Sequence, residues 1–347
     1  MGLAYAGSHR EDLTELLLPI VADDTANMEV ISLAALALGF IFVGSANGEI
    51  AGTILQTIME RLEPDESQLS DKWARFLVLG LALLYVGRQD ASEATIETLK
   101  AIPHAIGKQA QILVEICSYA GTGNVLKVQS LLHHCADHIV PPATPEGEPA
   151  TKEDDLFQAF AVIGIALVAM GEDVGAEMSL GQFGHLMTYG EPVVRKAVPL
   201  ALGLLSASNP QLKLLDTLSK YSHDNDLAVA LNSIMAMGLV GAGTNNARLA
   251  QMLRQLASYY HKEPDCLFMV RVAQGLVHMG KGTVGTNPYW CDRQIMSRTA
   301  VAGLLATLLA FTDAKACACF FPRLLSFFTK QYRQSFWTSL IGCCISW

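Results

Sequence analysis

The chain has 347 residues, of which 51% are hydrophobic and 16% are charged, and its formal net charge is −9. This composition is too apolar for a disordered chain, and the acidic balance argues against nucleic-acid binding and favours basic protein partners. The longest uncharged apolar run, residues 30–43, is shorter than the roughly 20 residues that a membrane-spanning helix needs. The first residues do not resemble a signal peptide, so we expect no membrane partner and a location in the cytoplasm and nucleus.

A repeated pattern runs through most of the chain. An apolar run rich in Ala, Leu and Met leads to a small residue, and a short polar turn follows. The copies lie about 35 to 45 residues apart, with one longer interval, which is the size of a two-helix repeat. Their closing small residues are Gly7, Gly44, Gly87, Gly121, Gly171, Ser208, Gly243 and Gly280.

Four segments are expected from this pattern. Repeats fill residues 1–138 and 156–311. Residues 139–155 are rich in proline and acids, which predicts a flexible loop. Residues 312–347 contain paired cysteines and no acid after Asp313, and we expect this tail to be disordered.

Each repeat reads as an outer helix followed by a buried inner one. Residues 48–62 show apolar positions three and four apart, which predicts an amphipathic helix that Asn47 caps after Gly44 ends the previous helix. Residues 71–86 predict a buried helix with Asp71 as its cap. The junctions 208–210 and 243–246 repeat the cap, the first with Pro210 at the first helical position.

Glycines also stand inside the predicted inner helices, at Gly39, Gly203, Gly238 and Gly275. A glycine inside a helix costs about 1 kcal/mol relative to alanine, so each position needs a packing reason. We expect them to let neighbouring inner helices approach closely.

Catalytic and ligand-binding motifs are weak. Residues 275–283 approach the phosphate-binding loop, but Gly282 stands where a hydroxyl is needed and the preceding run predicts a helix instead of a strand. His133, His134, Cys135 and His138 lie too close together on one helix to close a tetrahedral metal site. We therefore predict no enzyme activity, no cofactor and no metal.

Several stretches resemble one known family, the proteasome/cyclosome (PC) repeat. The resemblance covers roughly residues 2–311, and its motifs are Gly2–Ser8, Val43–Glu49, Phe183–Met187, Tyr221–Asp226, Ala236–Ala250 and Ala273–Leu276. Within the family, the chain is most similar to the smaller of the two PC-repeat scaffold subunits in the base of the 26S proteasome regulatory particle. The resemblance implies an all-α superhelix or toroid of about eight two-helix repeats, here an incomplete ring.

The resemblance also implies a function. Such subunits dock ubiquitin and the ubiquitin-like domains of shuttle receptors on outer helices of consecutive repeats, and they contact the proteasomal ATPases. The family's acidic docking positions fall on Glu49, Gln56 and Glu60, so one acid is replaced by an amide. The next outer helices, 91–100 and 124–134, would add Glu93, Glu97 and Gln129.

Two alternatives stay open. These polar residues are compatible with ordinary solvated helix faces. The chain as a whole is compatible with a purely structural or assembly solenoid that binds no ubiquitin.

Overall fold

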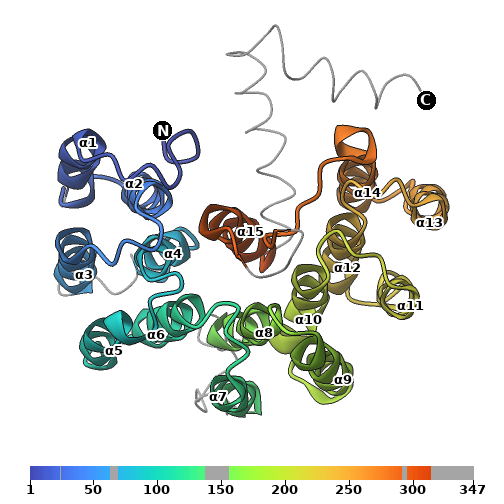
Figure 1. Cartoon of the computed structure of the whole chain (residues 1–347), viewed down its shortest axis with the longest axis horizontal. Coiled ribbons are helices and arrows are strands. Elements are labelled where there is room, and N and C mark those ends of the chain that lie inside the picture. Colours follow the sequence, from blue (N-terminus) through green and yellow to red (C-terminus); the bar gives the residue numbers. More distant parts are fainter. Residues whose placement is uncertain (24, 63–68, 137–155, 291–294, 314–347) are drawn as a thin grey trace, which may run out of the picture. The chain divides into compact units, whose positions relative to one another are not determined.

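The computed structural model describes residues 1–23, 25–62, 69–136, 156–290 and 295–313 (Figure 1). Over these residues the regular structure is helical: fifteen α-helices, a few short 3-10 turns, and one isolated bridge between Tyr289 and Met296. The all-α prediction is confirmed. None of the helices in this described part is both long and apolar enough to cross a bilayer.

The chain forms two compact units. Unit 1 comprises Met1–Gln182 and Tyr289–Ala306, and unit 2 comprises Phe183–Pro288 and the residues from Thr307 on. Two helices, α9 (Asp173–Tyr189) and α15 (Arg298–Phe311), contribute residues to both units.

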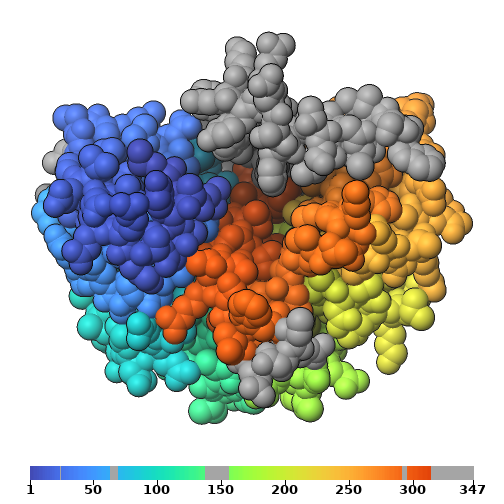
Figure 2. Space-filling view, turned by 45° about the horizontal axis from the view of Figure 1, so that its top comes forward, coloured from blue at the N-terminus to red at the C-terminus, as the bar shows by residue number. Residues whose placement is uncertain are grey.

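Unit 1 is a stack of helix pairs in which each outer helix packs on the inner helix that follows it, and each inner helix packs on the next (Figure 1). Its inner helices are α2 (Met28–Ile41), α4 (Ala74–Leu84), α6 (Ala105–Ser118) and α8 (Leu156–Ala169). Its outer helices are α1 (Asp12–Val21), α3 (Gly48–Leu62), α5 (Glu93–Lys100) and α7 (Val125–Ala136). The N-terminal residues, dark blue in Figure 2, gather on the face seen there.

Unit 2 repeats this arrangement. Its inner helices α10 (Pro192–Leu205), α12 (Leu227–Val240) and α14 (Pro264–Val277) pack one on the next. Its outer helices α11 (Leu212–Tyr221) and α13 (Ala247–Tyr259) pack on α12 and α14 respectively. The predicted two-helix repeat is therefore confirmed in each unit.

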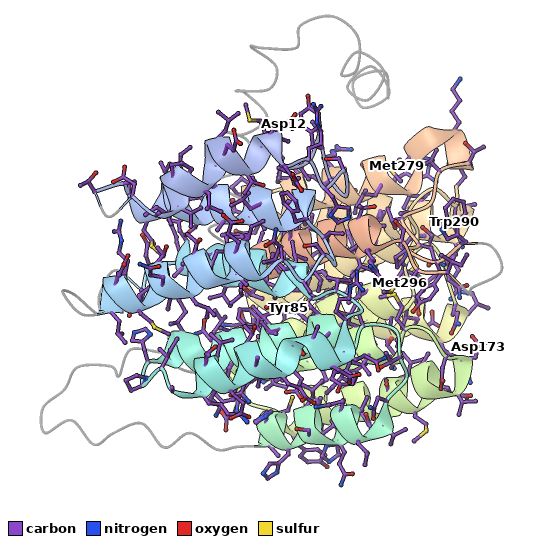
Figure 3. The ribbon with its side chains drawn as sticks, turned by 60° about the vertical axis from the view of Figure 1, so that its left-hand side comes forward. Asp12, Tyr85, Asp173, Met279, Trp290 and Met296 are labelled. Carbon is purple, nitrogen blue, oxygen red and sulfur yellow. The ribbon has the colours of Figure 1, made fainter. Side chains whose placement is uncertain are left out.

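The inner helices form the core, as predicted. Every residue of α8 from Phe157 to Ala169 is buried, and so is all of α4 except Phe76. Tyr85 follows α4 within the stack (Figure 3), where its hydroxyl lies 2.6 Å from the Thr95 hydroxyl of α5. A helix that is apolar all round must be covered on several sides, and the stacked repeat provides that cover.

Three of the four glycines singled out from the sequence sit where two inner helices cross closely. A Cβ added at Gly39 would lie 2.6 Å from the Gly80 carbonyl oxygen, and one at Gly203 would lie 3.0 Å from the Ala236 Cα. A Cβ added at Gly238 would lie 2.9 Å from the Ala273 Cα. The expectation is wrong for Gly275, because a Cβ added there would have no neighbouring atom within 4 Å.

The turns after the inner helices are linked by backbone hydrogen bonds. In unit 1 the N–H of Gly44 donates to the Leu83 carbonyl at 3.0 Å, and the N–H of Gly121 donates to the Leu167 carbonyl at 2.9 Å. Gly243 of unit 2 donates to the Leu276 carbonyl at 2.9 Å. Each bond is accepted by a carbonyl in the last turn of the next inner helix, where the regular helical hydrogen bonds end.

The left-handed backbone at these turns explains the repeated glycine. Gly44 has φ +65° and Gly243 has φ +64°. Glycine adopts this conformation without the steric cost that a Cβ brings. Ser208 does the same in its repeat with φ +56°, although it carries a side chain.

Two predicted helix starts are wrong. The residue before α4 is Trp73, and Asp71 instead supplies a backbone carbonyl to the Ala74 N–H at 2.9 Å. Pro210 precedes α11 by two residues, because Gln211 stays extended with ψ 138°. The predicted loop at 139–155, His138 and the tail beyond residue 313 lie outside the described residues.

Candidate functional site

The candidate site begins with helix α3, whose bounds are those predicted. The Asn47 side-chain oxygen accepts a hydrogen bond from the Glu49 N–H at 2.9 Å, so Asn47 caps the helix as expected. Glu49 therefore stands in the first turn, where the partial positive charge of a helix N-terminus favours a carboxylate.

Three site residues share the exposed face of α3. Glu49, Gln56 and Glu60 are exposed, while the opposite face, which includes Ile50 and Ile54, is fully buried. The Gln56 amide donates to the Glu60 carboxylate at 2.7 Å. This contact, four residues apart along the helix, holds the carboxylate in place along the exposed face.

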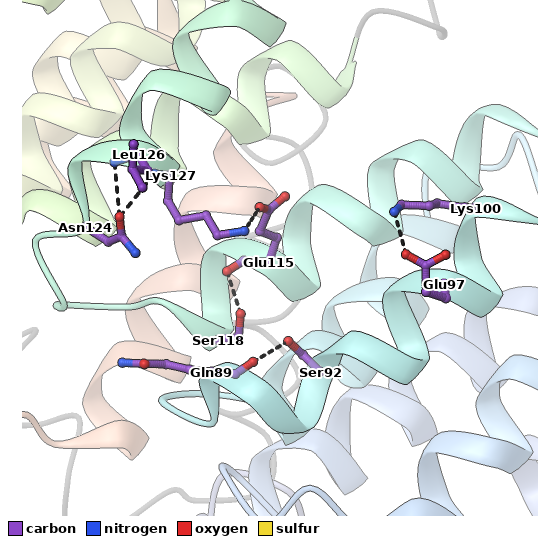
Figure 4. Close-up of polar contacts among 9 residues, drawn as sticks. All are labelled: Gln89, Ser92, Glu97, Lys100, Glu115, Ser118, Asn124, Leu126 and Lys127. Atoms are coloured by element: carbon purple, nitrogen blue, oxygen red, sulfur yellow. Dashed lines mark hydrogen bonds and ion pairs between the residues drawn. The ribbon is translucent and has the colours of Figure 1, made fainter.

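The predicted residues of α5 are exposed as well, but one of them is paired. Glu93 lies in the first turn of α5. Glu97 forms an ion pair with Lys100 at 2.6 Å on the surface (Figure 4). Because Lys100 offsets the charge of Glu97, Glu97 adds less negative charge to the α5 surface than Glu93 does.

Helix α7 offers a different surface. Gln129 is exposed, as predicted, but no acid accompanies it on this helix. Lys127 in its first turn is paired with Glu115 of α6 at 2.6 Å (Figure 4). All six predicted residues thus lie on three outer helices of unit 1, each set on its own helix, and the acidic ones are on α3 and α5.

These outer surfaces also have an apolar part, which was not predicted from the sequence. Met59 of α3 is 44% exposed beside Glu60, and Gly52 on the same face has open space where a side chain would stand. The signal was available, because positions 52 and 59 continue the spacing of 49, 56 and 60 around the helix. On α7 the first two residues, Val125 and Leu126, are highly exposed.

The buried thiols do not form a nucleophilic site. Cys117, Cys135 and Cys266 are free and buried. Burial raises the pKa of the Cys117 thiol to about 12 and that of Cys266 to about 11. A thiol with so high a pKa is almost entirely protonated near neutral pH and is a poor nucleophile.

The segment that resembles a phosphate-binding loop has another structure. It follows helix α14, as predicted, and Gly280 and Lys281 both have φ +57°. Asn245 donates to the Lys281 carbonyl at 2.9 Å and contacts His278 at 2.8 Å. Within the described residues, no three His, Cys, Asp or Glu side chains are grouped to bind a metal.

Comparison with known proteins relates these repeats to one family and one kind of complex. Residues 1–30 and 232–265 match the proteasome/cyclosome repeat family. The chain is 60% identical over 311 residues to the 26S proteasome regulatory subunit rpn1 of Schizosaccharomyces pombe, an alignment that covers 90% of this chain and 34% of that protein.

Similar proteins occur in other organisms. The chain is 50% identical over 315 residues to the 26S proteasome non-ATPase regulatory subunit 2 of Dictyostelium discoideum, covering 91% of this chain and 33% of that protein. It is 46% identical over 299 residues to homolog A of the same subunit in Arabidopsis thaliana. That alignment covers 86% of this chain and 32% of that protein. The chain spans about a third of the length of the relatives it matches.

Proposed function

Since this chain carries proteasome/cyclosome repeats and is homologous to regulatory subunits of the 26S proteasome, we propose that it is a non-catalytic scaffold that docks ubiquitin and the ubiquitin-like domains of shuttle receptors. The observation that carries the proposal is the exposed acidic face of α3, with Glu49, Gln56 and Glu60. The outer faces of α5 and α7 extend this docking surface.

The chemistry of α3 supports this choice of partner. Ubiquitin presents an apolar patch with a basic rim. Glu49 and Glu60 supply the opposite charge, and Met59 supplies an exposed apolar side chain on the same helix. Complementary charge of this kind steers the encounter and fixes its orientation.

Three further parts of the proposal follow from the family resemblance. The full-length protein would correspond to the smaller of the two PC-repeat subunits in the base of the regulatory particle. It would contact ATPase subunits there, and it would act in the cytoplasm and the nucleus.

Titration of labelled ubiquitin against the full chain tests the docking surface. We expect binding by the unaltered chain and at least a tenfold weaker affinity for Glu49→Lys/Glu60→Lys, because two attractive charges become repulsive. The matched control is Asp216→Lys/Glu263→Lys, which makes the same charge change at exposed positions of unit 2. This control should bind ubiquitin nearly as well as the unaltered chain.

Equal binding by the unaltered chain and the α3 variant would contradict the proposed surface. Absence of binding by both would instead favour the second candidate function, a structural solenoid that only holds other subunits together. The stacked, extensively buried inner helices support that candidate, because a rigid repeat array suits assembly whether or not it binds ubiquitin.

A further inference from the structure

Four large apolar side chains stand exposed at the starts of α7 and α9. Val125 is 66% exposed and Leu126 is 74% exposed, both in the first turn of α7. Val174 is 72% exposed and Met178 is 58% exposed, and they lie one turn apart on the same side of α9. We call these four residues, all in unit 1, the α7–α9 patch.

The two helix starts are held next to each other. The Gly123 N–H, just before α7, donates to the Val168 carbonyl near the end of α8 at 2.9 Å. A Cβ added at Gly123 would lie 2.6 Å from the carboxyl carbon of Glu172, which immediately precedes α9. The turns that lead into α7 and α9 are therefore in contact.

Local capping orders the start of α7. The Asn124 side-chain oxygen accepts the Leu126 N–H at 3.0 Å, and Lys127 reaches back to Glu115 (Figure 4). Leu126 remains at the surface next to this cap. The exposure of the apolar side chains thus belongs to an ordered helix start.

The charge around the patch is negative. Glu177 is exposed on α9 beside Val174 and Met178, and Glu172, which is also exposed, lies just before the helix. The lysine of the α7 first turn, Lys127, is offset by its ion pair with Glu115. The rim of the patch is therefore acidic.

We infer that the α7–α9 patch docks an amphipathic helix with a basic rim, contributed by a partner protein. Exposed apolar groups with a polar rim mark interaction sites, and a helix presents apolar residues at intervals that fit such a surface. The acidic rim selects lysine and arginine beside those residues. A second copy of this chain is a poorer fit, because the chain carries a net charge of −9.

This docking shares helix α7 with the proposed ubiquitin surface but does not involve the acidic residues of that surface. It is centred on apolar residues of α7 and α9, and it requires neither Glu49 nor Glu60. The two can fail separately, because variants of the α7–α9 patch leave the acidic face of α3 unchanged.

A fluorescent synthetic peptide of leucine and lysine at helical spacing serves as the probe for the full chain. We expect saturable binding, weakened at least tenfold by Leu126→Ser/Val174→Ser. Glu177→Lys should weaken it several-fold while keeping every apolar side chain. The matched control is Leu33→Ser/Leu212→Ser, which removes two exposed leucines elsewhere and should bind the peptide like the unaltered chain.

Three outcomes would overturn the inference. One is equal binding by the patch variant and its control, which would mean adsorption to the acidic surface in general. Another is equal binding of a leucine–glutamate peptide, which would show that the docked helix needs no basic rim. The third is concentration-dependent association of the chain that Leu126→Ser abolishes, since a second copy would then be the occupant.

Discussion

Gly39 and Gly52 both lie inside helices, but glycine has opposite effects on stability at the two positions. The position of a Cβ on Gly39 is occupied by the backbone of Gly80 in the next inner helix, whereas the space beside Gly52 is open. The close packing of the stack therefore requires a residue without a Cβ at position 39, whereas glycine at position 52 only lowers the stability of an exposed helix.

Alanine substitution at these two positions should change stability in opposite directions. Gly52→Ala should raise the free energy of unfolding by about 1 kcal/mol, because it removes the entropic cost of a helical glycine. Gly39→Ala should lower it by about 1 to 3 kcal/mol through overpacking against backbone. Urea denaturation followed by circular dichroism measures both.

The control for this pair is Gly184→Ala on α9, where the space is also open. It should behave like Gly52→Ala. A Gly39→Ala variant as stable as the unaltered chain would show that the crossing of α2 and α4 relaxes at no cost.

The thiol of Cys117 offers a second test at this scale. Burial raises its pKa to about 12, so the thiolate fraction near neutral pH is smaller than that of a free cysteine by a factor of about a thousand. We expect alkylation of Cys117, followed by mass spectrometry of its peptide, to be slow at neutral pH and to accelerate when urea unfolds the chain. A thiol that reacts in the folded chain at the rate of free cysteine would contradict its burial.

Among the elements, helix α13 has a cap that accepts two backbone N–H groups. The Asn246 side chain accepts the N–H groups of Arg248 at 3.0 Å and Leu249 at 3.3 Å. Asn246→Ala should therefore lower stability by about 1 kcal/mol, while Asn246→Asp should retain most of it because aspartate caps equally well. Thermal unfolding of the two variants separates capping from a general loss of the side chain.

The capped junctions also show how far the sequence predicts the elements. Helix α3 starts and ends where expected, because Gly44 and Asn47 are the strongest stop and cap signals nearby. Asp71 and Pro210 misled the prediction, because each lies in a turn where neighbouring residues compete for the cap and the backbone decides between them. The sequence also hid the difference between Gly275 and Gly238, which depends on the neighbouring helix alone.

The exposed face of α3 was predictable from the sequence, whereas the apolar surface at the start of α7 was not. Exposed acids at helical spacing indicate one face of α3 from the sequence alone. Apolar residues at a helix start, such as Val125 and Leu126, are indistinguishable from core residues until the packing of α7 is known. This is why the α7–α9 patch appears only in the structure.

At the scale of the whole chain, the net negative charge affects the rate at which partners associate. The net charge of −9 should accelerate the approach of a basic partner such as ubiquitin's docking face and slow that of an acidic one. We expect the association rate constant for ubiquitin to fall about tenfold between about 50 mM and 500 mM salt, because the Debye length shortens from about 14 Å to about 4 Å. Stopped-flow fluorescence measures it.

The dissociation rate should change less with salt, since short-range contacts such as those of Met59 are screened less than the long-range field. The Glu49→Lys/Glu60→Lys variant should show both slower association and a flatter salt dependence, because the local acidic field is lost at the docking face. An association rate equally sensitive to salt in this variant would place the steering charge elsewhere on the chain. The docking surface would then have to be sought on another outer helix.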